Sequence, residues 1–225
     1  MQRMMNKLSK TSKLGTKSWS LQAGIPADGG TCSGALSEDG GYVAACSGCY
    51  ARGGMYHFGA VKAVRADNKA AWQEPGWVAD MVAQLRKDTH FRWFDSGDLY
   101  SLSLAEKVYQ VMVQTPHVKH WLPTRMAKFT KYQPILAAMQ RLPNVMVRFS
   151  SDSVGGDFTP GVHGSTIIHD AESAPGGVSV CPAYSQGGKC LDCRACYDKS
   201  IAVIAYPAHG KKMAKVIRLS VVATA

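Results

Sequence analysis

The stretch FRWFDSGDLYSLSLAEKVYQVMVQTPHVKHWLPTR, residues 91–125, contains two different apolar patterns. Residues 91–98 are typical of a short aromatic-rich strand that ends in a polar turn, and residues 119–125 of a second strand. Between them, residues 101–115 start with a serine and repeat apolar residues at helical spacing. A strand, a helix and another strand in this order predict a βα unit of a parallel sheet.

The same alternation continues on both sides of this stretch. Apolar periodicity predicts further helices at residues 60–72, 77–87 and 131–142. Further strands are expected at residues 144–152, 165–170, 177–183 and 201–209, the last three separated by glycine-rich loops. We therefore predict an α/β fold, a compact or incomplete parallel (β/α) TIM-type barrel with a cysteine-rich C-terminal metal-binding segment.

Polar side chains follow each predicted strand. They are Asp95, Ser96, Gly97 and Asp98, then Thr124 and Arg125, then Ser150, Ser151 and Asp152, and finally His169, Asp170, Cys181, Tyr206 and His209. The carboxyl ends of parallel strands share one edge, where α/β proteins bind their ligands. The sequence therefore predicts a ligand site at this edge.

The chain of 225 residues has a formal net charge of +10 and seven cysteines. The charge fits a protein that binds nucleic acid, although cysteine thiolates on a metal would reduce it. No apolar run is long enough for a membrane span and no secretory signal is visible, so we expect no membrane partner. Residues 1–17 carry five basic residues and no acid, which predicts a flexible basic leader before a single domain at 18–225.

Cys32, Cys46 and Cys49 form the first cysteine group, with the spacing C-x13-C-x2-C. An odd number of cysteines cannot all pair in internal disulfides, and without a secretory signal the C-x-x-C spacing favours metal ligation. Two residues between thiols let both sulfurs reach one metal or cluster. Three thiolates on a 4Fe–4S cluster would leave one iron free to bind substrate or cofactor.

Four further cysteines form the second group, with the spacing C-x8-C-x2-C-x2-C. They are Cys181, Cys190, Cys193 and Cys196. Four thiolates can close a site around a second 4Fe–4S cluster, and structural zinc is the alternative. A single cluster that takes ligands from both groups is a third arrangement.

Six segments of the chain resemble the gene-product-88 family of bacteriophage proteins. They are SWSLQAG (18–24), CSGCYA (46–51), FRWFDSGD (91–98), WLPTR (121–125), VRFSSD (147–152) and CPAYSQGGKCLDCRACYD (181–198). The resemblance implies a phage-encoded, cysteine-rich protein, which we expect in the host cytoplasm, with association with the virion as the alternative.

A looser similarity is to radical S-adenosylmethionine enzymes, which place a three-cysteine cluster before a parallel βα barrel. Cys32, Cys46 and Cys49 would fill those positions. Ser96 and Gly97 would lie where that superfamily contacts its cofactor. This similarity implies S-adenosylmethionine as a second cofactor and an electron donor as a partner.

We expect an iron–sulfur enzyme that acts on a small molecule, either as a lyase such as a cysteine desulfidase or by radical S-adenosylmethionine chemistry. In the lyase, Asp95 or Asp98 would remove a proton and Arg125 would bind a substrate carboxylate. His169 is a further catalytic candidate, and Ser150 and Asp152 are expected to contact the cofactor. The alternative is a non-enzymatic protein, stabilised by zinc or a cluster, that binds nucleic acid or a virion partner.

Overall fold

The computed structural model of the chain describes residues 6–223, with side chains described as far as residue 217. It contains one eight-stranded sheet in the order β1-β2-β3-β4-β5-β6-β8-β7. The strands are β1 (Ser9–Lys10), β2 (Lys17–Trp19), β3 (His90–Trp93), β4 (Lys119–Thr124), β5 (Val145–Ser150), β6 (Gly164–Ile168), β7 (Ser179–Val180) and β8 (Val203–Pro207). All neighbouring strands are parallel except β1 and β2.

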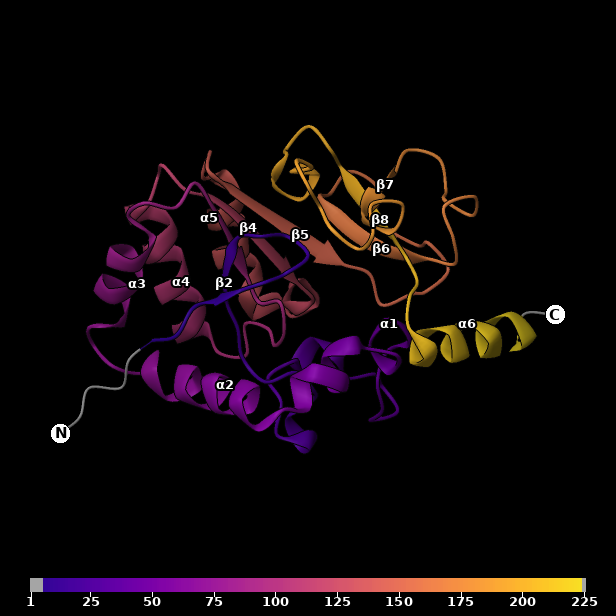
Figure 1. The fold of residues 1–225 in the computed structure, drawn as a ribbon, viewed down its shortest axis with the longest axis horizontal. Helices are drawn as coiled ribbons and strands as arrows, with labels where there is room; N and C mark the ends of the chain where they lie inside the picture. Colours follow the sequence, from indigo (N-terminus) through magenta and orange to yellow (C-terminus); the bar gives the residue numbers. More distant parts are fainter. Residues whose placement is uncertain (1–5, 224–225) are drawn as a thin grey trace.

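The helices are α1 (Ala44–Ser47), α2 (Gly59–Ala71), α3 (Trp77–Leu85), α4 (Leu102–Gln114), α5 (Gln133–Arg141) and α6 (Lys211–Ala223). Figure 1 shows α3, α4 and α5 gathered at one end of the molecule and β6, β7 and β8 at the other. The Ser101 hydroxyl accepts a hydrogen bond from the Leu104 amide at 3.2 Å, which explains where α4 begins. The βα alternation predicted for the middle of the chain is confirmed.

The sheet is open, so a closed barrel is not formed. Within residues 6–223, β1 pairs only with the neighbouring β2, and the two-residue β7 pairs only with β8. Because β8 enters between β6 and β7, the last strand in sequence is not available to close the sheet on the first strands. The fold is a mixed α/β fold with a mostly parallel sheet.

Residues 6–17, which were expected to be a flexible leader, pack on the domain. Leu14 is buried against Trp121, and the Asn6 side chain accepts a hydrogen bond from the Trp19 indole. Residues 1–5 of that predicted leader lie outside the described part of the chain.

The two faces of the sheet are covered differently because successive strand residues point to opposite sides. On one face Phe91, Trp93 and Val147 join a large apolar core with α3, α4 and α5. On the other face Trp121 and Met146 pack against Leu14 and Tyr197, together with half-buried Cys190 and Cys196. The cysteine-rich C-terminal segment thus covers the face that the helices leave free.

Among the described residues, none of the helices has the combined length and apolar character that a membrane crossing requires.

His120 of β4 is fully buried in the helix-covered face. The Trp93 indole N–H donates to Nδ1 of His120 at 3.3 Å, so Nε2 carries the proton and faces the Thr115 hydroxyl at 2.9 Å. Burial lowers the pKa of His120 from 6.5 to about 3. The ring is therefore neutral in the folded protein at neutral pH.

This neutral histidine predicts a loss of stability in acid. Between pH 6.5 and about 3 the unfolded chain takes up a proton that folded His120 excludes, so the contribution is complete above pH 6.5 and is lost as the pH falls. We expect the free energy of unfolding, measured by urea titration, to fall by about 1.4 kcal/mol per pH unit more in the wild type than in His120→Gln. His57→Gln, at an exposed site, should keep the wild-type slope; identical slopes for all three proteins would contradict the prediction.

Candidate functional site

A cavity of about 740 Å³ lies at the carboxyl ends of the central strands. Its lining includes the predicted residues Asp95, Ser96, Gly97, Asp98, Arg125 and Ser150. It also includes six of the seven cysteines, namely Cys32, Cys46, Cys49, Cys181, Cys190 and Cys196. Segments from the two ends of the chain therefore contribute thiols to one cavity.

The first cysteine group is built on short turns. Cys46 lies in α1, and the Cys49 amide donates to the Cys46 carbonyl at 3.2 Å. Gly48 separates the two thiols and lies against α6, since a Cβ on it would come within 2.7 Å of the Met213 Cα. The Cys32 amide is fixed by the Gly24 carbonyl at 2.8 Å.

All three thiols of this group are free. Burial, together with the negative charge of Asp98, raises the pKa of Cys32 to about 12. Burial also raises the pKa of Cys46, although Arg125 opposes that shift. Without a bound cation Cys32 and Cys46 stay protonated, so neither is suited to nucleophilic thiolate chemistry by itself.

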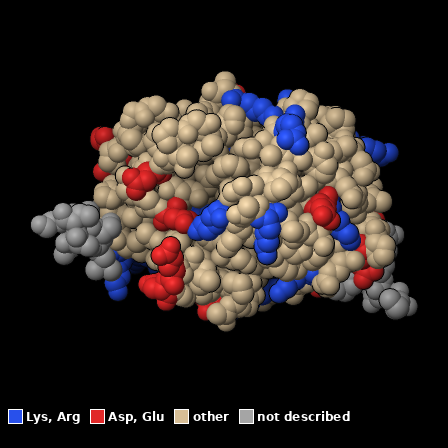
Figure 2. Space-filling model, turned by 180° about the vertical axis from the view of Figure 1, so that it is seen from behind, with Lys and Arg blue, Asp and Glu red and all other residues tan. Residues whose placement is uncertain are grey.

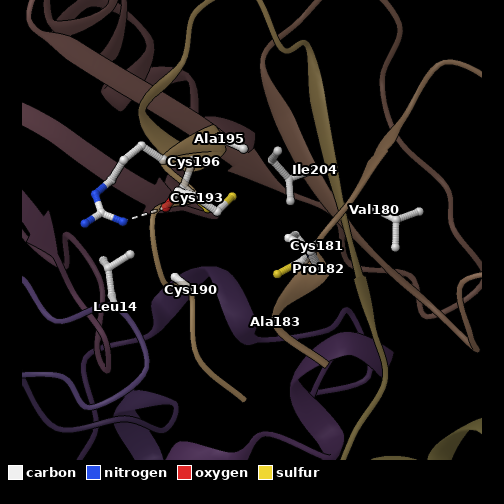
Figure 3. Close-up of a pocket in the computed structure, with 11 residues that line it drawn as sticks. Leu14, Val180, Cys181, Pro182, Ala183, Cys190, Cys193, Ala195, Cys196 and Ile204 are labelled. Carbon is white, nitrogen blue, oxygen red and sulfur yellow. Dashed lines mark hydrogen bonds between the residues drawn. The ribbon is translucent and has the colours of Figure 1, made fainter. Parts of the chain in front are cut away.

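The second cysteine group surrounds a smaller cavity of about 20 Å³, which is enough for little more than one water molecule. Cys181, Cys190, Cys193 and Cys196 all line it (Figure 3). The Cys193 amide donates to the Cys190 carbonyl at 2.8 Å, and Cys196 Sγ lies 3.3 Å from the Tyr206 hydroxyl. Cys181, Cys190 and Cys196 line both cavities, so the two cysteine groups adjoin.

In the described part of the chain, no group of three or more His, Cys, Asp or Glu side chains is arranged to hold a metal ion. A single tetrahedral ion would need its thiolates at about 2.3 Å from one point. Neither cysteine group is drawn together in that way.

Arg148 of β5 holds the second group against the sheet. Its side chain is fully buried, and its guanidinium donates to six backbone carbonyls at 2.9–3.4 Å. They belong to Gly164, Ala195, Cys196, Asp198, Ile201 and Ala202. One side chain therefore fixes the path of residues 195–202.

The carboxylate of Asp98 links two strand ends. It accepts hydrogen bonds from the Thr124 hydroxyl at 2.7 Å and from the Arg125 amide at 2.9 Å, and burial raises its pKa. Gly97 adopts φ +80°, and a Cβ there would lie 2.7 Å from Leu21 Cβ. Glycine is therefore needed at this position for the backbone conformation and for the close contact with Leu21.

Asp95 is held by its own set of partners. It accepts hydrogen bonds from the hydroxyls of Ser20 and of Tyr56, the latter at 3.1 Å, and Arg65 lies 3.7 Å away. Ser96 accepts a hydrogen bond from Arg65 Nε at 2.6 Å. The Asp95 carboxylate therefore already has an ion-pair partner and two hydrogen-bond donors within the protein.

Arg125 is also occupied within the protein. Its Nε lies 3.3 Å from the Asp152 carboxylate, and its Nη2 donates to the Ser151 carbonyl at 2.9 Å. Asp152 itself, like His169, is not among the described residues that line the cavity. The structure therefore brings most of the predicted site residues to one cavity but leaves these two outside it, together with Cys193, which lines only the smaller cavity.

Several cavity residues did not emerge from the sequence as candidates, among them Arg65, Arg92 and Tyr56. Arg92 had one signal: it is a charged residue between Phe91 and Trp93 in a strand that otherwise resembles buried core. In an alternating strand, such a residue faces the side opposite to the core.

Replacement of Arg148 should free the second cysteine group. Arg148→Met removes six hydrogen bonds, although the Ala195 and Ala202 carbonyls keep another backbone donor, and we therefore expect the free energy of unfolding to fall by roughly 3 kcal/mol or more. Amide hydrogen exchange should accelerate in residues 195–202 first. Arg141→Met, at the exposed end of α5, should change stability by less than about 0.5 kcal/mol. Wild-type exchange rates in Arg148→Met would show that the segment is held by other contacts.

Comparison with known proteins finds a match to the family model described as gene product 88, over residues 2–171. The matched range contains the first cysteine group and the ends of β3, β4 and β5, and it stops before the second group. No curated protein and no solved structure matches the chain. The match supports the resemblance to this phage family, whereas the looser similarity to radical S-adenosylmethionine enzymes gains no support from it. The chain belongs to the gene product 88 family.

Proposed function

We propose that this protein is an iron–sulfur enzyme in which Cys32, Cys46 and Cys49 hold a 4Fe–4S cluster with one iron open to a small molecule. The observation that carries the proposal is the meeting of cysteines from residues 32–49 and 181–196 in one cavity of about 740 Å³. That volume lies within the range of about 300–1,000 Å³ common for small-molecule sites.

The donor set of the first group fits such a cluster. Its thiols are free, and burial and neighbouring negative charges raise the pKa of Cys32 to about 12. Thiolates here would need an added positive charge, which the irons of a cluster supply.

The second group is proposed as a closed site. Four cysteines around a cavity of about 20 Å³ leave no position for a substrate. The cysteine spacing favours a second 4Fe–4S cluster as the occupant, whereas the small volume of the cavity suits its alternative, a single zinc ion. Its role would be to stabilise a segment that has little regular secondary structure.

The proposed reaction is a lyase reaction on a small sulfur-containing or amino-acid substrate. When bound, the open iron would supply Lewis-acid activation of the leaving group. Both carboxylates accept hydrogen bonds, but Asp98 is the better candidate for the base because no cation of the described residues lies within ion-pair distance of it, whereas Arg65 lies 3.7 Å from Asp95. Asp98 also acts electrostatically on Cys32 and Cys46, which puts it beside the proposed cluster. We propose the host cytoplasm as the place of action, since the family is one of bacteriophage proteins.

Nucleic-acid binding has less support than the cavity chemistry. On the face seen in Figure 2, basic side chains are interspersed with acidic ones and do not form one continuous patch. A binding surface for a polyanion would concentrate its positive charge.

Metal analysis of anaerobically purified protein tests the cluster. We expect brown wild-type protein with broad absorbance near ~400 nm and with both iron and acid-labile sulfide. Cys49→Ala should lose the iron of the first site, while Cys193→Ala should lose only that of the second. Ser47→Ala, in the same turn but exposed, should keep the wild-type content. Colourless protein with stoichiometric zinc would rule out the enzyme as proposed.

Sulfide release tests the reaction. Wild-type protein should release sulfide from L-cysteine without added reductant, Cys49→Ala should be inactive, and Asp98→Asn should lower kcat by roughly 100-fold or more if Asp98 is the base. Formation of 5′-deoxyadenosine from S-adenosylmethionine and dithionite, without sulfide release, would replace the lyase with the radical reaction.

A further inference from the structure

Three arginines line the large cavity, and two of them are neutralised by the chain. Arg65 lies 3.7 Å from Asp95, and Arg125 lies 3.3 Å from Asp152. For Arg92, no carboxylate of the described residues comes within ion-pair distance. The cavity thus contains one guanidinium without a counter-ion.

The orientation of Arg92 follows from its place in β3. Phe91 and Trp93 point into the helix-covered core, so Arg92 points to the opposite face and into the cavity. Its guanidinium carbon lies 4.7 Å from the centre of the Trp121 ring, and Tyr50 is among the groups that act on its charge. The Tyr50 hydroxyl donates to the Asp95 carbonyl at 3.2 Å. Asp95 also acts on the charge of Arg92, but from beyond ion-pair distance.

One polar atom of Arg92 has no partner. Its Nε is buried and makes no hydrogen bond with any described residue. A buried N–H without an acceptor costs about 1–3 kcal/mol. The Nε edge of a guanidinium presents two parallel donors, which match the two oxygens of a carboxylate.

We infer that Arg92 is the anchor for a substrate carboxylate, and that the substrate is a small monocarboxylic acid such as an amino acid. The planar fork of one guanidinium matches the two oxygens of one carboxylate, and the other two arginines of the cavity, Arg65 and Arg125, are already paired. Lys10 and Lys13 also line the cavity, so inorganic phosphate is the competing anion. This role was expected for Arg125 from the sequence, but that side chain is bound to Asp152 and Ser151.

The position of Arg92 suits such an anchor. Its partner Tyr50 directly follows Cys49, and its charge also acts on Cys196 of the second group. A small acid held on Arg92 would therefore lie in the cavity that cysteines of both groups line. As a statement about a substrate, the inference rests on the proposed function, but the carboxylate site itself is built only from residues of the chain.

Ligand-observed NMR titration of anaerobically purified protein tests this anchor with L-alanine, which resembles cysteine but has no sulfur to release. L-alaninamide, which lacks the carboxylate, and inorganic phosphate are the comparison ligands. We expect wild-type protein to bind L-alanine at least about 10-fold more tightly than either of them. This comparison needs no variant, so it does not depend on the folding of a mutant.

Variants then assign the site to Arg92. Arg92→Met should weaken L-alanine binding by about 30-fold or more, and Arg92→Lys by about 10-fold, because lysine keeps the charge and loses the planar fork. Arg86→Met, at an exposed position outside the cavity, should bind like the wild type. Equal binding of alanine and alaninamide, tighter binding of phosphate, no detectable binding of L-alanine by the wild type, or wild-type affinity in Arg92→Met would each overturn the inference.

Iron and sulfide content, measured on the same samples, separates this inference from the proposed function. Arg92-dependent binding by iron-free protein would support the anchor and reject the iron–sulfur enzyme. Full iron content together with wild-type affinity in Arg92→Met would reject the anchor and leave the enzyme in place.

Discussion

The buried guanidinium of Arg148 is the contact on which the site depends most. The C-terminal cysteine segment has little regular secondary structure, so few backbone hydrogen bonds of its own hold it in place. Arg148 supplies six hydrogen bonds to backbone carbonyls from one rigid, planar guanidinium, and these take the place of regular backbone pairing. A buried charge is costly unless it is fully hydrogen-bonded, so the segment and the arginine stabilise each other. Without this contact the large cavity would lose one wall.

Alternation along the central strands explains why that wall stands opposite the helices. In β3 and β5, apolar residues such as Phe91, Trp93 and Val147 enter the core, while Arg92 and Arg148 point to the other face. An ordinary two-layer sheet would expose those arginines to water. Here the C-terminal segment covers them, and the chain provides acceptors for Arg148 but no counter-ion for Arg92. The same pattern of residues therefore yields one structural cation and one open cation.

Local patterns in the sequence predicted the helices, the central strands and the polar residues at the strand ends. Those features depend on spacing and capping, as the Ser101 start of α4 shows. The open sheet was not predictable in this way, because closure depends on which strands pair across long separations, and β8 enters between β6 and β7. The sequence also did not predict β1 and β2, because two or three residues are too few to show a periodic pattern. It did not predict α6 either, because that helix follows a long region in which no helix was expected.

The arginines of the cavity show that the sequence alone also could not predict which site residues are paired within the chain. Arg125, at a predicted strand end, was a reasonable carboxylate anchor until Asp152 and Ser151 were found to occupy it. Arg92 lies in the middle of a strand, and its one signal was a charge between the apolar residues Phe91 and Trp93. What distinguishes the two is the set of partners supplied by distant segments, which a single sequence does not contain. Two of the three arginines in the cavity have an ion-pair partner within the chain, whereas Arg92 has no carboxylate within ion-pair distance among the described residues. A guanidinium left in this way, in a cavity that free cysteines also line, is an arrangement that can take up an anionic ligand.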